Sequence, residues 1–201
     1  MLPGALDSAQ DLVRHGFVQA VRECNLPIDV MVADAHTEYY LQHRVVERLA
    51  LDVIQPALAS GYRHIWLMGI SLGGLGALAY LHTHSAQVEG ALLLAPFLGN
   101  RGLIAEVTRA GGLADWLPGV VEPGDDERIL LAWLKGYGAG DANAPPIWLG
   151  YGHEDRFAPA SELLAALLPV ERIVSVAGGH DWHTWQQLWK QLLLRNLFEI
   201  R

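Results

Sequence analysis

Hydrophobic residues follow two different periods along this chain. Short apolar segments rich in Val, Ile and Leu predict buried strands at residues 28–33, 64–69, 88–95, 146–151 and 172–177. Longer segments between them repeat apolar positions with a helical period, at residues 9–23, 41–59, 72–84, 160–168 and 182–198. Strands that alternate with helices are typical of a parallel sheet covered on both faces. The sequence therefore predicts an α/β fold, a three-layer α/β/α sandwich around a mostly parallel sheet.

Residues 99–143 break this alternation. The segment holds many Gly residues, several Pro residues and an acidic patch at Glu122, Asp125, Asp126 and Glu127. We expect only short helical pieces in it, such as 129–134. Two interpretations fit an insert of this length between two strands: a lid over the serine edge of the sheet, or an ordinary long surface connection.

Length and composition limit the classes of protein that the chain can belong to. With 201 residues, of which 51% are hydrophobic, it can bury one substantial core, and we interpret residues 1–201 as a single domain. Its 14 basic and 22 acidic residues give a net charge of −8, and Lys and Arg form no run. Nucleic acid and membrane surfaces are therefore not expected as partners.

The same composition bears on the cellular compartment. Charge or Gly interrupts every apolar stretch before it reaches a bilayer-spanning length, and the first residues lack the order of a signal peptide. The single cysteine, Cys24, cannot form an internal disulfide, which fits a reducing compartment. We expect a cytoplasmic protein, and the sequence leaves its oligomeric state open.

The pentapeptide Gly-Ile-Ser-Leu-Gly at residues 69–73 is the most informative motif. It closes the predicted strand 64–69 and opens the predicted helix 72–84. A sharp turn between a strand and a helix is the setting in which the middle serine of a G-x-S-x-G motif becomes an exposed nucleophile. Ser71 is therefore the candidate nucleophile.

A lone serine hydroxyl reacts poorly near neutral pH, so it needs a base and an acid that orients the base. His180 follows a predicted strand and a Gly-Gly turn, and Asp155 lies in the loop after another predicted strand. His183, one helical turn beyond His180, is the alternative base. Asp181 and Asp141 are the alternative acids, but Asp181 adjoins the histidine in sequence and Asp141 precedes its strand.

The chain order Ser71, Asp155, His180, each placed after a predicted strand, resembles the α/β-hydrolase superfamily. The resemblance covers most of the chain. It implies that Ser71 attacks a carbonyl carbon and that His180 takes the serine proton and passes it to the leaving group. It also implies that Asp155 holds the imidazole in the useful tautomer.

Members of this superfamily stabilise the oxyanion with two backbone N–H groups. The resemblance implies that Leu72, the residue after the nucleophile, supplies one of them. Residues 2–6 resemble the early loop that supplies the other, and we expect Ala5 or Leu6 as the donor, because Pro3 has no N–H. Superfamily members generally have further strands before this loop. We therefore expect the early strands to be missing from the sheet, or the start of the chain to have been trimmed.

Substrate-pocket candidates come from segments that follow strands, where ligands collect in open parallel sheets. His36 and Tyr39 lie in such a segment, Phe97 precedes the insert, and Trp182 neighbours His180. The alternative for His36 and Tyr39 is loop packing, and for Trp182 it is burial of the last helix against the sheet.

Two further motifs have ordinary explanations. His82 and His84 are two residues apart on a predicted helix, where side chains diverge, so we expect no metal site. Residues 74–79 imitate a dinucleotide-binding G-x-G-x-x-A motif, but they lie inside the predicted helix, and we interpret them as close helix–sheet packing. No organic cofactor is expected.

Together these features predict a serine hydrolase that cleaves a carboxylic ester or thioester of a small to medium acyl group through an acyl-enzyme. Acyl transfer to an acceptor other than water uses the same residues and stays open. A non-catalytic member of the fold, which binds a ligand or a protein through the same cleft, is the alternative from another class.

Overall fold

The computed structural model describes residues 1–138, 144–195 and 197–198. Within these residues four parallel strands form one sheet in the order β1-β2-β3-β4. The strands are β1 (Trp66–Ile70), β2 (Gly90–Leu94), β3 (Ile147–Gly152) and β4 (Ile173–Val176). They confirm four of the five predicted strands.

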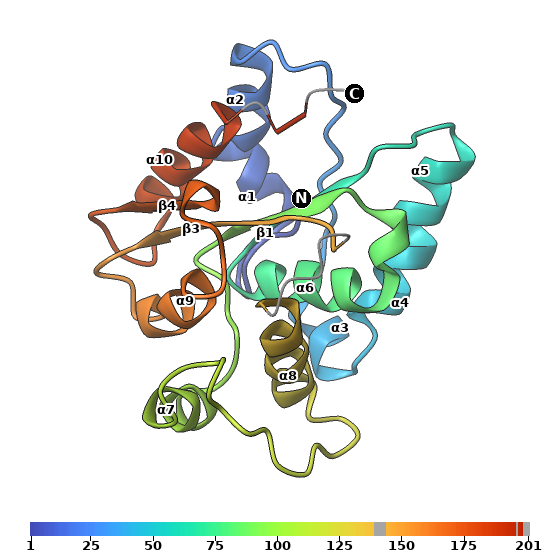
Figure 1. The fold of residues 1–201 in the computed structure, drawn as a ribbon. Helices are drawn as coiled ribbons and strands as arrows, with labels where there is room; N and C mark the ends of the chain where they lie inside the picture. Colours follow the sequence, from blue (N-terminus) through green and yellow to red (C-terminus); the bar gives the residue numbers. More distant parts are fainter. Residues whose placement is uncertain (139–143, 196, 199–201) are drawn as a thin grey trace.

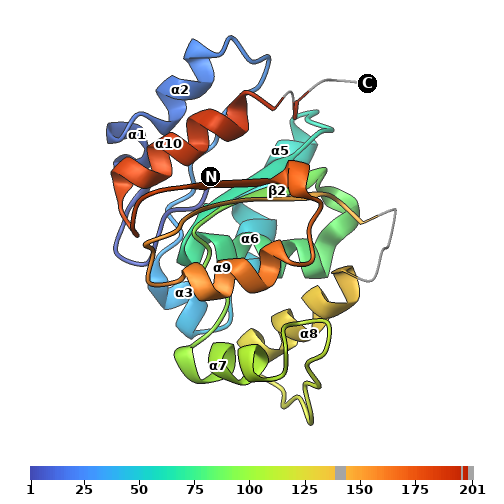
Figure 2. The same cartoon turned by 60° about the vertical axis from the view of Figure 1, so that its left-hand side comes forward.

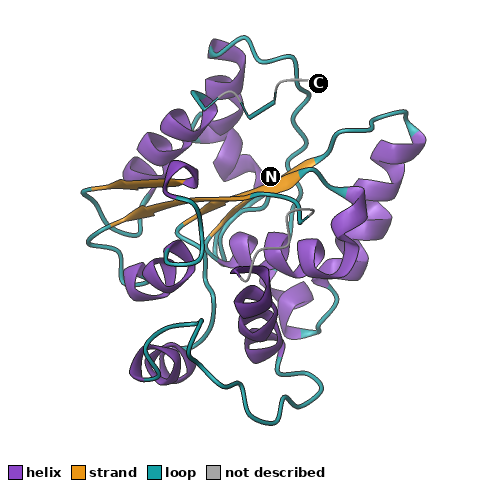
Figure 3. Cartoon of the chain, in the orientation of Figure 1, coloured by secondary structure: helices purple, strands orange, loops and turns teal. Residues whose placement is uncertain are grey.

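Ten α-helices lie within the described residues. They are α1 (Ala9–Arg14), α2 (Phe17–Glu23), α3 (Thr37–Leu41), α4 (Val45–Leu49), α5 (Gln55–Ala59), α6 (Leu72–His84), α7 (Arg101–Arg109), α8 (Asp126–Gly138), α9 (Ala158–Ala165) and α10 (Trp182–Leu193). Helices α10, α1 and α2 cover one face of the sheet, and α6 and α9 cover the other (Figures 1 and 3). The three-layer α/β/α prediction is confirmed.

The strands separate two hydrophobic cores because successive side chains point to opposite faces of a sheet. On β2, Leu92 and Leu94 belong to the core under α10, whereas Ala91 and Leu93 belong to the core under α6. β2 is buried along its whole length. Burial on both faces explains why this strand is a continuous apolar run rather than an alternating one.

The predicted strand at 28–33 is wrong. This segment is held beside the sheet by the chain start: Met1 donates its terminal amine to the Met31 carbonyl at 2.6 Å, and the Ala33 N–H donates to the Met1 carbonyl at 3.0 Å. Leu2 in turn forms a parallel bridge with Gly69 of β1. Pairing over so few residues does not extend into a ladder, so the apolar composition of 28–33 misled the prediction.

Three predicted helices differ from the observed ones: the first is divided, the second begins later and the last ends earlier. The prediction of one helix over 9–23 is wrong, because Gly16 adopts a left-handed conformation with φ of 76° and separates α1 from α2. The helix predicted over 41–59 is preceded by α3, and His43 turns the chain with φ of 56° before α4 begins. From α4 the helix runs through a π-helical turn, Ala50–Ile54, into α5. The last predicted helix, 182–198, ends at Leu193.

The insert 99–143 contains more helix than we predicted. Its α7 and α8 are full helices, so the expectation of only short pieces is wrong; residues 139–143 lie outside the described residues. In Figures 1 and 2, α7 and α8 lie on the outer side of the layer that contains α6 and α9. α7 contacts α9, and α8 contacts α6. A lid function for the insert stays a prediction.

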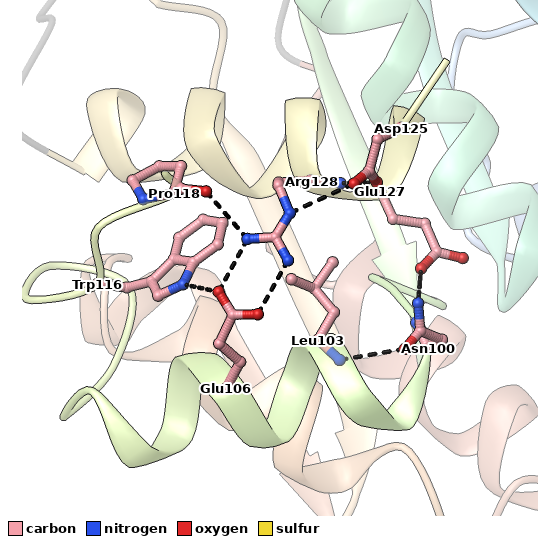
Figure 4. A network of polar contacts seen from close by, with 8 residues as sticks. All are labelled: Asn100, Leu103, Glu106, Trp116, Pro118, Asp125, Glu127 and Arg128. Atoms are coloured by element: carbon pink, nitrogen blue, oxygen red, sulfur yellow. Dashed lines mark hydrogen bonds and ion pairs between the residues drawn. The ribbon is translucent and has the colours of Figure 1, made fainter. Parts of the chain in front are cut away.

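A polar network joins the two helices of the insert (Figure 4). The Arg128 guanidinium of α8 forms a bidentate pair with the Glu106 carboxylate of α7, at 2.8 and 2.9 Å, and also bonds Asp125 at 3.3 Å. The buried Trp116 indole N–H donates to the same Glu106 carboxylate at 2.8 Å. These bonds lower the pKa of Glu106 from 4.5 to about 2, with the Arg128 hydrogen bond as the largest cause.

None of the described helices is both long and apolar enough to cross a membrane.

Candidate active site

Ser71 occupies the turn between β1 and α6. Its φ of 51° and ψ of −114° are strained for a residue with a side chain, and such strain is typical of functional turns. The Ser71 N–H donates to the Leu94 carbonyl at 3.0 Å, which fixes the turn to β2. A Cβ at Gly69 would overlap the Gly73 carbonyl, and a Cβ at Gly73 would overlap the Leu2 carbonyl. Both glycines of the motif are therefore required by close backbone approach.

Ser71, His180 and Asp155 lie in hydrogen-bonding contact. The Ser71 Oγ is 3.0 Å from His180 Nε2, and His180 Nδ1 is 2.7 Å from Asp155 Oδ2. With its proton on Nδ1, the imidazole donates to the carboxylate and accepts from the serine hydroxyl. Ser71 is 8% exposed and Asp155 is 4% exposed, so these contacts are largely shielded from water.

Two loops at the carboxyl edge of the sheet carry the histidine and the acid. Asp155 ends a turn that follows β3, and His180 lies between β4 and α10. The Glu154 N–H donates to the Gly178 carbonyl at 3.0 Å, which ties the two loops together. Asp155 and His180 are 25 residues apart in sequence, but they lie close together because β3 and β4 are neighbouring parallel strands.

Neighbouring groups fix the orientation of the histidine and the acid. The second carboxylate oxygen of Asp155 accepts from the Phe157 N–H at 2.7 Å. The His180 ring meets the rings of Phe157 and Trp185 edge-on, with centroid distances of 4.8 and 5.0 Å. Both rotamers are therefore held by packing as well as by the hydrogen bond between them.

The alternative base and one alternative acid make other contacts, and the second alternative acid lies outside the described residues. His183 Nε2 is 2.7 Å from the Gln187 amide on the exposed side of α10. Asp181 accepts from the Thr184 N–H at 2.9 Å and caps α10, and this bond is the main reason why its pKa is lowered. Asp141 lies outside the described residues.

Two segments were predicted to supply oxyanion donors: the start of α6 and the early loop. Leu72 is the first residue of α6, so its N–H has no carbonyl partner within the helix. The early loop forms a turn in which the Asp7 N–H donates to the Gly4 carbonyl at 3.2 Å. Ala5 and Leu6 form the tip of this turn, and Leu6 is 99% exposed. That either of them acts as a donor stays a prediction.

A cavity of about 550 Å³ lies next to this turn. It is lined by Ala5, Leu6, Asp7, Ser8, Asp34, His36, Thr37 and Glu38. The early loop and the start of α3 form its wall. Of the four predicted pocket residues, His36 belongs to this lining.

The other three predicted pocket residues pack elsewhere around the site. Tyr39 lies against His36 with a ring distance of 6.1 Å and packs against the core. The Phe97 N–H donates to the Ser71 carbonyl at 2.9 Å, and its ring contacts Phe157. Trp182 stacks on His15, the residue that ends α1, with ring centroids 4.1 Å apart.

Sequence reasoning missed Asp7, which lines this cavity and whose carboxylate and Ser71 both border Gly4. Burial, followed by the charge of Asp11, raises the pKa of the Asp7 carboxyl, while His15 and His180 act in the opposite direction. The signal that could have found it is its place directly after the early loop. Phe157 was also missed, because nothing in the sequence indicates that it contacts the histidine.

The residues of the two remaining motifs lie in α6. The His82 ring lies against Trp133, whereas the His84 ring stacks on Tyr80. Across the described part of the chain, no three His, Cys, Asp or Glu side chains are grouped so that they could hold a metal ion. Residues 74–79 lie within α6, as expected.

Comparisons with known proteins bear on the fold. No protein-family model and no curated protein matches the sequence. Among solved structures, a ferulic acid esterase matches with a TM-score of 0.64 and 17% identity over 98% of this chain and 84% of its own. An S-formylglutathione hydrolase from Staphylococcus aureus matches with a TM-score of 0.66 and 15% identity, over 98% of this chain and 79% of its own.

A third match is a fluorophosphonate-binding serine hydrolase from Staphylococcus aureus, with a TM-score of 0.61, 14% identity, and coverage of 98% of this chain and 82% of that one. At such identities the likeness is one of architecture. The parallel sheet, the strand–turn–helix at Ser71 and these matches over nearly the whole chain lead to one conclusion: this protein has the α/β-hydrolase fold.

Proposed function

We propose that this protein is a serine hydrolase that cleaves carboxylic esters or thioesters of small to medium acyl groups. The observation that carries the proposal is the continuous contact from Ser71 Oγ to His180 Nε2 and from His180 Nδ1 to Asp155 Oδ2. A serine, an imidazole and a carboxylate in this order are the parts that acyl transfer requires.

In the proposed mechanism, Ser71 Oγ attacks the carbonyl carbon of the substrate while His180 Nε2 takes the hydroxyl proton. The tetrahedral intermediate collapses, the C–O or C–S bond breaks, and the imidazolium returns the proton to the leaving group. Water then attacks the acyl-enzyme with His180 as base, which releases the acid and restores Ser71. Asp155 keeps the imidazole in the required tautomer and stabilises its charged form.

The proposed oxyanion donors are the N–H of Leu72 and that of Ala5 or Leu6. The position of Leu72 at the start of α6 supports the first, since the free N–H groups and the partial positive charge of a helix start favour a developing negative charge. The second is supported by the early loop, which borders Ser71 through Gly4.

A small to medium acyl group suits a chain of this size, and the structural matches to a ferulic acid esterase and an S-formylglutathione hydrolase support ester and thioester chemistry. We also propose that the protein is cytoplasmic. The free, half-buried Cys24 supports this location, because a reducing compartment suits an unpaired thiol.

A series of p-nitrophenyl esters of increasing acyl length tests the proposal. We expect turnover that is highest for short acyl chains and that falls at least about a thousandfold in Ser71→Ala. Ser161→Ala is the matched control, because Ser161 is also a buried serine but lies in α9. Folded wild-type protein that hydrolyses none of the esters would contradict the proposal, whereas turnover that requires an added alcohol or thiol acceptor favours acyl transfer.

A further inference from the structure

We propose that Asp7 makes the site selective for esters or thioesters that carry a positive charge close to the reacting carbonyl. The charged part, a substituted ammonium group, would lie in the cavity that Asp7 lines. The inference rests on the proposed hydrolase function, and it names the substrate class that this function left open.

The position of the Asp7 carboxylate relative to the nucleophile is the first argument. Gly4 lies between them: a Cβ at Gly4 would stand 2.6 Å from Asp7 Oδ2 and 3.7 Å from Ser71 Cβ. His180 is also close enough for its charge to act on Asp7. A charged group of the substrate that contacts Asp7 would therefore lie within a few bond lengths of the carbonyl that Ser71 attacks.

The absence of a partner is the second argument. Across residues 1–138, 144–195 and 197–198, no side-chain hydrogen bond or ion pair engages the Asp7 carboxylate. By contrast, Asp34 pairs with His36 at 3.2 Å, Glu38 accepts from Gln42 at 2.8 Å, and Asp11 bonds Ser8 at 2.6 Å. The neighbouring carboxylates are thus occupied, and Asp7 alone of these four offers both oxygens to a ligand.

The local charge is the third argument. Three carboxylates line the cavity, Asp7, Asp34 and Glu38, and His36 is the one side chain of its lining that can become positive. Negative charge beside Ser71 opposes formation of the oxyanion, unless the substrate brings a compensating positive charge. We assign that compensation to Asp7, because Asp34 and Glu38 already have hydrogen-bond or ion-pair partners.

The raised pKa of the Asp7 carboxyl agrees with this role. Burial is its largest cause, the Asp11 charge adds to it, and His15 and His180 oppose it. An unpaired, partly buried carboxylate is unfavourable for the folded state, and a bound ammonium group would remove that disadvantage.

The test compares two thioesters of the same shape. Acetylthiocholine carries a quaternary ammonium group, and 3,3-dimethylbutyl thioacetate replaces its nitrogen with carbon. We expect wild-type protein to prefer the cationic thioester by about tenfold in kcat/KM, which corresponds to about 1.4 kcal/mol, and we expect Asp7→Asn to lose the preference. Glu38→Gln is the matched control, because Glu38 lines the same cavity but is already hydrogen-bonded, and it should keep the preference.

The ratio of the two kcat/KM values separates selectivity from damage, because a misfolded variant loses both activities together. Equal ratios in wild type and Asp7→Asn overturn the inference and leave the hydrolase function standing. The same conclusion follows if the Glu38→Gln ratio collapses as well, since the effect then belongs to the general charge of the cavity. Wild type that cleaves p-nitrophenyl acetate but neither thioester likewise overturns the inference alone, whereas folded wild type that cleaves none of these three compounds overturns the proposed function as well.

Discussion

His180 and His183 are three residues apart, on either side of the start of α10, and have different surroundings. This difference gives the first prediction. His180 contacts Ser71 and Asp155, whereas His183 bonds Gln187 on the protein surface. We expect His180→Ala to lower kcat for p-nitrophenyl acetate at least about a thousandfold. His183→Ala should stay within about twofold of wild type. The reverse pattern, in two variants with wild-type melting curves, would move the base to His183.

Asp155 gives a second prediction at the same scale. In Asp155→Asn the amide oxygen can still accept the Phe157 N–H, so we expect the fold to survive. The amide cannot hold the imidazole in the useful tautomer, and kcat should fall by about ten-thousandfold. Steady-state kinetics with circular dichroism provide the measurement. Asp181→Asn is the control, because that carboxylate caps α10 and does not contact His180; similar losses in both variants would contradict the assigned roles.

The residues of the site differ in how far the sequence could predict them. The structure brings Ser71, Asp155 and His180 into contact. The sequence could indicate these three residues because each follows a predicted strand, and local patterns indicate where strands end. Asp7 and Phe157 were not indicated, because each reaches the site through contacts between loops that are distant in sequence. Nothing local indicates that the turn after Gly4 approaches Ser71.

At the scale of elements, the segment from β1 through α6 was predicted best. Its apolar strand, glycine turn and small-residue helix each specify one structure locally, and the bounds of α6 agree with the prediction. The strand prediction for residues 28–33 failed because an apolar run does not become a strand without a long enough neighbour to pair with. The prediction of one helix over 9–23 failed because a single left-handed residue, Gly16, divides the helix although the hydrophobic period continues.

The close backbone approach at the turn predicts a difference between two glycines. Gly69→Ala should lower the free energy of unfolding by about 2 kcal/mol or more, since its Cβ would meet the Gly73 backbone, which cannot move aside. Gly136→Ala is the control: Gly136 lies on the exposed side of α8 with open space beside it, and alanine should raise stability by about 0.5–1 kcal/mol. Urea unfolding measures both changes. Equal effects would contradict the packing of the turn.

At the scale of the whole molecule, the two helices of the insert are joined through Arg128 and Glu106, and this contact has a pH dependence. The pKa of Glu106 is lowered from 4.5 to about 2. The Arg128–Glu106 contact therefore stabilises the fold fully above about pH 4.5, and this stabilisation is lost as the pH falls toward 2. We expect Glu106→Gln to melt below wild type at pH 7 and the difference to shrink at pH 3.

Differential scanning fluorimetry across this pH range is the measurement. Glu122→Gln, exposed on the same insert, is the control and should follow the wild type at every pH. A Glu106→Gln difference that persists unchanged at low pH would mean that packing rather than charge joins α7 to α8.

The three-layer architecture was predictable because alternating strands and helices have few ways to cover a sheet. The place of the insert was not, since α7 and α8 are positioned by long-range contacts with α9 and α6 and by the Arg128 network. The cavity beside Asp7 is likewise a property of the assembled molecule. It forms where the early loop meets the start of α3.

The most direct test of the central claim is covalent labelling by a fluorophosphonate probe, followed by intact mass measurement and peptide mapping. Such a probe reacts with a serine that a neighbouring base activates. We predict one added probe per chain, located on Ser71, and no addition to Ser71→Ala or His180→Ala. Folded wild-type protein that stays unlabelled, or that carries the probe on another serine, would contradict an activated Ser71.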